Sequence, residues 1–84
     1  MAKTNYSPTF PMYPGDAAAV TPSDTVNLRE PSIIWIGTTG SVRVLTAQGS
    51  DVTFSAVPGG AVLPVQVIRV WATGTSATNI IRIF

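Results

Sequence analysis

The stretch that decides the fold is Val62–Ala72, VLPVQVIRVWA, which is the longest run of β-forming residues in the chain. Side chains alternate between the two faces of a strand, so this run divides into two sets: Val65, Val67, Arg69 and Trp71 on one face, and Gln66, Ile68 and Val70 on the other. Pro64 is expected at the start of the strand or on a sheet edge, because proline cannot donate to the ladder. The segment therefore predicts a strand that is apolar on both faces.

Five further strands are predicted around this run, separated by Gly, Pro and polar turns. They cover residues 25–28, 32–36, 41–46, 51–57 and 79–84. Val42 and Val44 share one face of their strand, and Val52 and Phe54 are expected to point inward from theirs. Residues 16–20 are compatible with one turn of helix before Pro22 ends it. The pattern predicts an all-β fold, a small antiparallel β-sandwich or barrel of about six short strands.

Composition divides the chain into an extended N-terminal arm, residues 1–22, and a β-sandwich domain, residues 23–84. Prolines are frequent in the arm, and each disfavours a helix. Between them lie four large apolar side chains: Tyr6, Phe10, Met12 and Tyr13. Interfaces favour these residue types, which makes them candidate partner-binding residues. The alternative is a tail that packs only on its own domain.

The apolar content is high for so small a protein. Hydrophobic residues make up 45% of the 84 residues and charged residues 11%, against about 25% charged in typical soluble domains. The chain has no Cys and no His, so neither disulfides nor the usual zinc ligand sets can support the fold. Several strands are apolar on both faces, whereas a sandwich needs only one buried face per strand. The second face predicts a covering subunit or the arm, and hence a homo-oligomer.

The same composition excludes most chemistry. Without His or Cys, the common general bases and thiol nucleophiles are missing, and the four acidic residues form no motif. We predict no enzyme activity, no catalytic residues, no metal and no cofactor. A net charge of +1 argues against nucleic acid as a partner, and the longest apolar runs fall far short of the roughly 20 residues that span a membrane.

Five residues inside the β runs are possible interface residues: Trp35, Arg43, Arg69, Trp71 and Arg82. The arginines either point to solvent or pair with carboxylates across a subunit interface, where Arg is the favoured cation. The tryptophans belong to the core or an interface, or they stack on a glycan or a base. A glycan-binding adhesion module and a small nucleic-acid-binding barrel therefore remain as alternatives.

Two stretches carry a resemblance to a known family. They are DAAAVTPSDTVNL, residues 16–28, and DVTFSAVPGGAVLPVQVIRVWATGT, residues 51–75. This pattern resembles the small spike-base and head-decoration proteins of tailed phages and gene transfer agents, over residues 16–84. Residues 1–15 of the arm lie outside the resemblance.

The resemblance implies a bacteriophage virion structural protein on the outer surface of the capsid. It would be a decoration or cement protein that binds the major capsid protein and itself, as a homotrimer in preference to a pentamer, and stabilises capsid contacts. A pentameric spike base at the capsid vertices is the alternative. The arm's partner and the position on the capsid stay open.

Overall fold

The computed structural model describes residues 15–84, and in this part of the chain every regular element is a β-strand. The strands are β1 (Ala17–Ala19), β2 (Ser32–Thr38), β3 (Gly40–Thr46), β4 (Asp51–Val57), β5 (Val62–Val70) and β6 (Thr78–Ile83). They form one antiparallel sheet in the order β1-β6-β2-β5-β3-β4. The predicted all-β fold of about six short antiparallel strands is confirmed.

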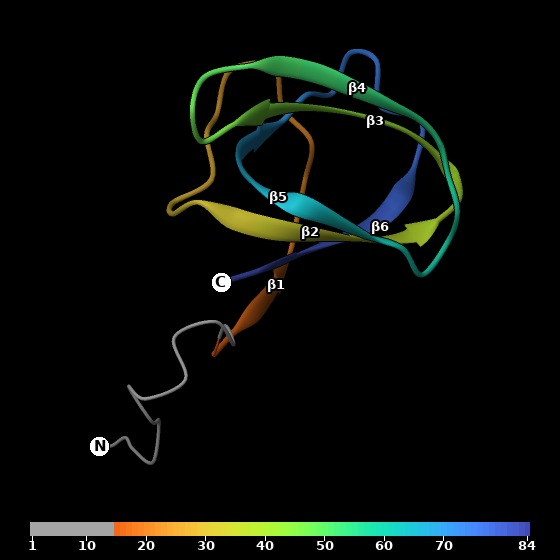
Figure 1. The fold of residues 1–84 in the computed structure, drawn as a ribbon, viewed down its shortest axis with the longest axis horizontal. Helices are drawn as coiled ribbons and strands as arrows, with labels where there is room; N and C mark the ends of the chain where they lie inside the picture. The colour runs from red at the N-terminus through yellow and green to blue at the C-terminus, as the bar shows by residue number, and fades with distance from the viewer. Residues whose placement is uncertain (1–14) are drawn as a thin grey trace.

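The sheet rolls over on itself, so that β3 and β4 lie across from β2, β5 and β6 (Figure 1). The core fills the space between these two halves. Its ten members are all apolar: Ile34, Ile36, Val42, Val44, Val57, Leu63, Val67, Val70, Ala77 and Ile80. Val42 and Val44, predicted to share one face of their strand, are both fully buried.

One predicted strand and the turn of helix are wrong. Residues 25–28 form a loop, although the amide of Leu28 donates to the carbonyl of Ile68 at 2.7 Å and ties this loop to β5. The sixth strand is instead β1, which lies within residues 16–20, the segment considered compatible with one turn of helix. Three alanines are too short a run to sustain a helix by themselves, and pairing with the exposed edge of β6 satisfies the same backbone groups.

A β-bulge changes which residues of β5 share a face. Leu45 of β3 faces Arg69 and the next residue, Thr46, faces Val67, so β5 holds one extra residue there. The shift turns Val70 into the core together with Val67. The sequence prediction that Val67 and Arg69 share a face is therefore wrong, because strict alternation does not survive a bulge.

The strand β4 is an edge of the sheet, and its burial differs from the prediction. Phe54 packs against the core, but Val52 is 38% exposed. Val52 pairs with Val44 in the register, so it has the inward orientation expected of it, but the edge position leaves it with no neighbour on one side. Near the end of β4, Ala56 has a left-handed φ of 55° at a register irregularity, which bends this edge.

Candidate interaction surfaces

The first candidate surface is the outer face of the sheet, the side of β1, β6, β2 and β5 that points away from the core. Residues paired across antiparallel strands point to the same side. The register pairs Ile33 with Ile83, Trp35 with Ile81 and Trp35 also with Val62. Ala17 and Ala19 face Ile83 and Ile81 in turn. The outer face thus comprises seven residues, Ala17, Ala19, Ile33, Trp35, Val62, Ile81 and Ile83.

None of these seven residues is charged, and none is fully buried. Val62 is 50% exposed, and Trp35 and the isoleucines are partly exposed. Their neighbours on the opposite face of the same strands, Ile34, Ile36 and Ile80, are at most 3% exposed. The sheet therefore presents an uncharged apolar face next to a complete core, as the two-sided apolar pattern predicted.

The second candidate surface is a cluster on the opposite half of the molecule around Trp71. The guanidinium carbons of Arg43 and Arg69 lie 4.4 and 4.7 Å from the centre of the indole ring, within cation–π range. The indole Nε1 is shielded from solvent and finds no acceptor among the described residues. Arg and Trp are the residue types most enriched at interface hot spots.

Both arginines of this cluster are already held by groups of their own chain. Arg43 makes a two-point contact with Asp51, at 3.0 Å from Nε and 2.7 Å from Nη2. Arg69 donates from Nε to Oδ1 of Asn27 at 2.8 Å and from Nη1 to the carbonyl of Asp24 at 3.2 Å. The contacts of Arg43 join β3 to β4, and those of Arg69 join β5 to the loop before β2 and hold that loop in place.

Two carboxylates of this region have pKa values below the ordinary value of the group. Hydrogen bonds from the side chain and the amide of Thr73 lower the pKa of Asp24 below its ordinary 3.8. The hydrogen bond from Arg43 lowers the pKa of Asp51, and the same contact raises the pKa of Arg43. Each shift favours the charged form of the group.

Arg82 lies on the core side of β6, at the end of the sheet. Its Nη1 donates to the carboxylate of Glu30 at 2.7 Å, and the Arg82 side chain is only 12% exposed. The guanidinium carbon lies 3.9 Å from the centre of the Phe84 ring. The hydroxyl of Ser32 lies 3.4 Å from the same nitrogen and is buried. This arginine therefore closes the end of the core with an ion pair inside the chain.

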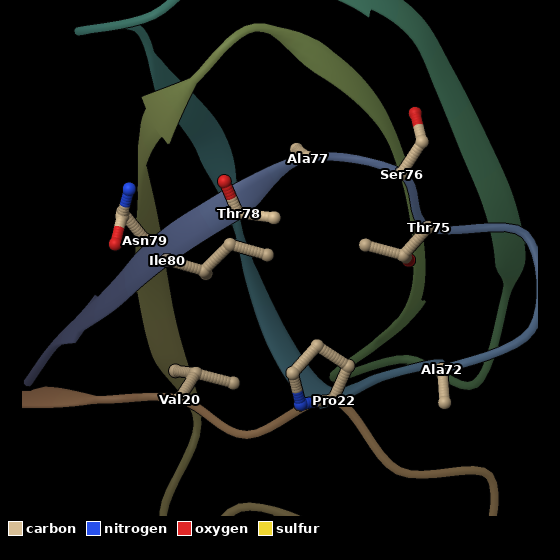
Figure 2. Close-up of a pocket in the computed structure, with 9 residues that line it drawn as sticks. All are labelled: Val20, Pro22, Ala72, Thr75, Ser76, Ala77, Thr78, Asn79 and Ile80. Carbon is tan, nitrogen blue, oxygen red and sulfur yellow. The ribbon is translucent and has the colours of Figure 1, made fainter.

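The third candidate surface is a pocket of about 400 Å³ at the end of the sheet where β6 begins (Figure 2). Val20 and Pro22 form one wall, and the buried Ala77 and Ile80 form its floor. Five small or polar residues complete the lining: Ala72, Thr75, Ser76, Thr78 and Asn79. No lining residue is charged, so the pocket suits an apolar or neutral group.

Residues 15–84 contain no group of three or more acidic, His or Cys side chains that could hold a metal ion. In the same part of the chain, no helix has the length and apolarity needed to cross a membrane. The pocket lacks a titratable side chain, and Arg43, Arg69 and Arg82 are paired or hydrogen-bonded. The described residues thus offer surfaces for binding and no arrangement for acid–base chemistry.

The five possible interface residues divide between different places. Trp35 belongs to the outer face, Arg43, Arg69 and Trp71 meet in one cluster, and Arg82 is separate from both. The arm residues Tyr6, Phe10, Met12 and Tyr13 lie outside the described residues. The sequence did not reveal the pocket, because three separate segments supply its lining and no local motif marks it.

Comparison with solved structures gives a match along almost the whole chain. It is a chain in the capsid of a native gene transfer agent particle, computed with C5 symmetry. The two are 31% identical over 99% of this chain and 95% of the other, and they superpose with a TM-score of 0.77. The chain belongs to the family of this capsid-particle protein.

Membership of this family confirms the broader part of the resemblance found in residues 16–84, that to capsid-related proteins of phages and gene transfer agents. The match is also longer than that stretch, since it covers 99% of the chain. No protein-family model matches the chain, and no curated protein matches it.

Proposed function

We propose that the protein is a non-enzymatic structural component of a phage-like capsid that binds the outer capsid surface and strengthens contacts between major capsid subunits. The observation that carries this proposal is the outer face, an uncharged apolar surface on a member of a capsid-particle family. Its chemistry is that of a permanent protein contact. Cores of such interfaces are depleted of charge and enriched in aromatic residues such as Trp35.

The proposed mechanism is mechanical. Burying apolar surface contributes about 25 cal/mol per Å², so a contact covering the outer face resists separation of the capsid subunits that it touches. Symmetric copies on one particle act together, which multiplies a modest contact into strong reinforcement. The residues of the arm would add to this contact through Tyr6, Phe10, Met12 and Tyr13.

Self-association is part of the proposal. The chain is short, and the outer face and the pocket are apolar surfaces that residues 15–84 leave open. A closed symmetric oligomer, with a trimer favoured over a pentamer, would cover one of these surfaces and leave the other for the capsid. A vertex spike base is the alternative within the same family. The mass of the purified protein, measured with and without capsids, distinguishes a trimer from a pentamer.

A glycan-binding role is less well supported by the geometry. The Trp71 ring already carries two guanidinium groups, at 4.4 and 4.7 Å from its centre, and a sugar ring would compete with them for the same indole. Trp35 is the other tryptophan, and the register places it between the apolar residues Ile81 and Val62 of the outer face. This setting favours a protein contact.

The test uses two valines that differ in position and little else. Val62→Asp places a charge on the outer face at a side chain that is 50% exposed, and Val26→Asp places the same charge on a loop residue that is 66% exposed. We expect Val62→Asp to lower co-sedimentation with capsids lacking this protein by at least about tenfold, because a buried unpaired charge costs several kcal/mol. Val26→Asp should bind as the unaltered protein does.

Circular dichroism of both variants controls for folding. Equal capsid binding by Val62→Asp, Val26→Asp and the unaltered chain would refute a capsid contact through the outer face. Loss of binding by both variants alike would mean that added negative charge, rather than the outer face, governs association.

A further inference from the structure

The pocket in Figure 2 is large enough to admit an aromatic side chain. Its volume of about 400 Å³ lies at the low end of the range of about 300–1,000 Å³ that ligand sites span. The floor is already part of the core, since Ala77 and Ile80 are only 4% and 3% exposed. The rim is polar, with Thr78 and Asn79 exposed at its edge. An apolar body with a polar tip therefore fits it best.

The chain leaves the described domain at the opposite end of the same strand. Gly15 and Asp16 both donate their amides to the carbonyl of Phe84, at 3.1 and 3.0 Å, and Phe84 donates back to Asp16 at 2.9 Å. Residues 15–16 thus continue the antiparallel pairing of β1 past the last residue of β6. The pocket lies where β6 begins, at Thr78, about 20 Å away for a strand of this length.

We propose that this pocket receives the side chain of Tyr6 from a second copy of the chain, so that copies join head to tail. The inference rests on the self-association in the proposed function and names the contact that produces it. Donor and acceptor are different surfaces at opposite ends of β6, so the contact between copies is heterologous, and such a contact forms a ring when its rotation closes. Each copy both gives and accepts one arm, and the contact repeats until the ring closes.

Tyr6 is the arm residue with the right chemistry and reach. Its ring would pack on Val20, Pro22 and Ile80, and its hydroxyl would meet the polar rim, as tyrosine does at interfaces. Tyr6 is nine positions before Gly15, which gives a reach of about 30 Å in extended form. Tyr13 is only two positions before Gly15, which gives a reach of only about 7 Å. The three prolines at positions 8, 11 and 14 restrict the free chain, so less conformational entropy is lost when an extended arm binds.

The pocket of the same copy is a poorer destination. The pairing at Asp16 and Phe84 directs the chain out past the end of the sheet, so a return would require a reversal within the two or three residues before Gly15. The returning segment would then run beside β1 as an added strand. Pro8, Pro11 and Pro14 lack the amide protons that such a strand needs. A neighbouring copy requires no reversal.

The first experiment measures the mass of the purified chain by sedimentation over a range of concentrations, without capsids. Tyr6→Ala should weaken self-association by about tenfold or more, the usual effect of truncating an interface aromatic. Thr78→Trp should do the same, because the new ring fills the pocket. Val26→Trp adds the same ring to an exposed loop residue and should leave the mass unchanged.

Thermal unfolding of each variant controls for the fold. A chain that remains monomeric at millimolar concentration would overturn the inference. So would oligomers that withstand both Tyr6→Ala and Thr78→Trp.

The second experiment exploits the absence of cysteine from the chain. A variant carrying both Tyr6→Cys and Thr78→Cys is oxidised and run on a non-reducing gel. Contact between copies yields covalent dimers and larger species, because the two thiols reach disulfide distance only across the interface. A control with Tyr6→Cys and Val26→Cys should remain a single chain.

An internal disulfide in the first variant would show that the arm occupies its own pocket and would overturn the exchange between copies. Absence of any disulfide would show that Tyr6 does not reach the pocket.

These results are independent of the capsid assay. If Tyr6→Ala abolishes self-association while Val62→Asp still abolishes capsid binding, both proposals hold, each through its own surface. If self-association is lost and no variant affects capsid binding, the arm contact is right and the outer face is wrong. If capsid binding depends on Val62 but the mass never responds to Tyr6 or Thr78, only the arm contact fails.

Discussion

The two faces of β2 and β6 are built from nearly the same residues, yet the fold treats them differently. On the core side, Ile34, Ile36 and Ile80 are at most 3% exposed. On the outer side, Ile33, Ile81 and Ile83 occupy neighbouring positions of the same strands and remain partly exposed. Residue type therefore does not decide which face is the core. The sheet curves so that one face encloses the core, and the other face stays partly exposed although it is uncharged and apolar.

The largest expected effect comes from truncating the same residue type on each face. Ile34→Ala should lower the free energy of unfolding by about 2–5 kcal/mol, because it opens a cavity in a closed core. Ile33→Ala should cost roughly 1 kcal/mol, because its side chain already meets solvent. Urea denaturation measures both. Equal losses would mean that the outer face is as enclosed as the core.

Gly37 tests how tightly the outer face closes beside Trp35. A Cβ added there would lie 2.6 Å from the Cβ and the backbone oxygen of Asn79 and 3.1 Å from the indole ring of Trp35. Gly37→Ala should therefore destabilise the domain by about 1–3 kcal/mol through overpacking. Gly49→Ala is the matched control, since a Cβ there meets open space and only its φ of 93° opposes the change. Thermal unfolding of the two variants should rank Gly37→Ala as the more damaging.

Arg82 offers a further test of the difference between the two faces, because it is a charged residue on the core side of β6. Arg82→Ala removes the ion pair with Glu30 and the contact with the Phe84 ring, and should cost about 1–2 kcal/mol of stability. Arg29→Ala, which removes the same charge from an exposed position in the loop before β2, should change the unfolding free energy by less than about 0.5 kcal/mol. Similar values for the two would show that the Arg82 contacts contribute nothing beyond charge.

The smallest effect on stability is expected at acidic pH, because the groups that titrate, Asp24 and Asp51, lie on neither face of β2 and β6. The pKa values of Asp24 and Asp51 are lowered in the folded chain, so their contribution to stability is complete above the ordinary value of 3.8 and is lost as the pH falls below it. The melting temperature should thus decline modestly once the pH drops below 3.8. In a variant with Asp24→Asn and Asp51→Asn, this part of the decline should disappear. A steeper loss in that variant than in the unaltered chain would contradict the assignment.

The comparison also shows how far the sequence could lead. A run that is apolar on both faces predicted the strand over residues 32–36. Alternation predicted the strand over residues 41–46 and the shared face of Val42 and Val44, because neighbouring side chains on a strand point to opposite sides. The sequence contains no His and no Cys, which excludes general-base catalysis by His and nucleophilic catalysis by a thiol. For the candidate surfaces, the sequence predicted that a second apolar face exists and that it includes Trp35.

Other features could not be predicted, because they depend on distant parts of the chain. The bulge opposite Leu45 and Thr46 turned Arg69 out of the core face, and nothing local to β5 signals it. The choice of residues 17–19 over 25–28 as the sixth strand depended on the open edge of β6. Arg43 and Trp71 are distant in the sequence, and only the pairing of β3 with the end of β5 brings them together.

The sequence by itself determined that this protein is all-β, that several of its strands are apolar on both faces, and that it lacks His and Cys, the usual general bases and thiol nucleophiles. The tertiary structure decided which of two similar faces became the core, where Arg43 and Arg82 found their partners, and that a neutral pocket lies at the far end of β6 from Gly15. The physical reason is that alternation fixes which side chains share a face, whereas burial is fixed by contacts between segments far apart in the chain.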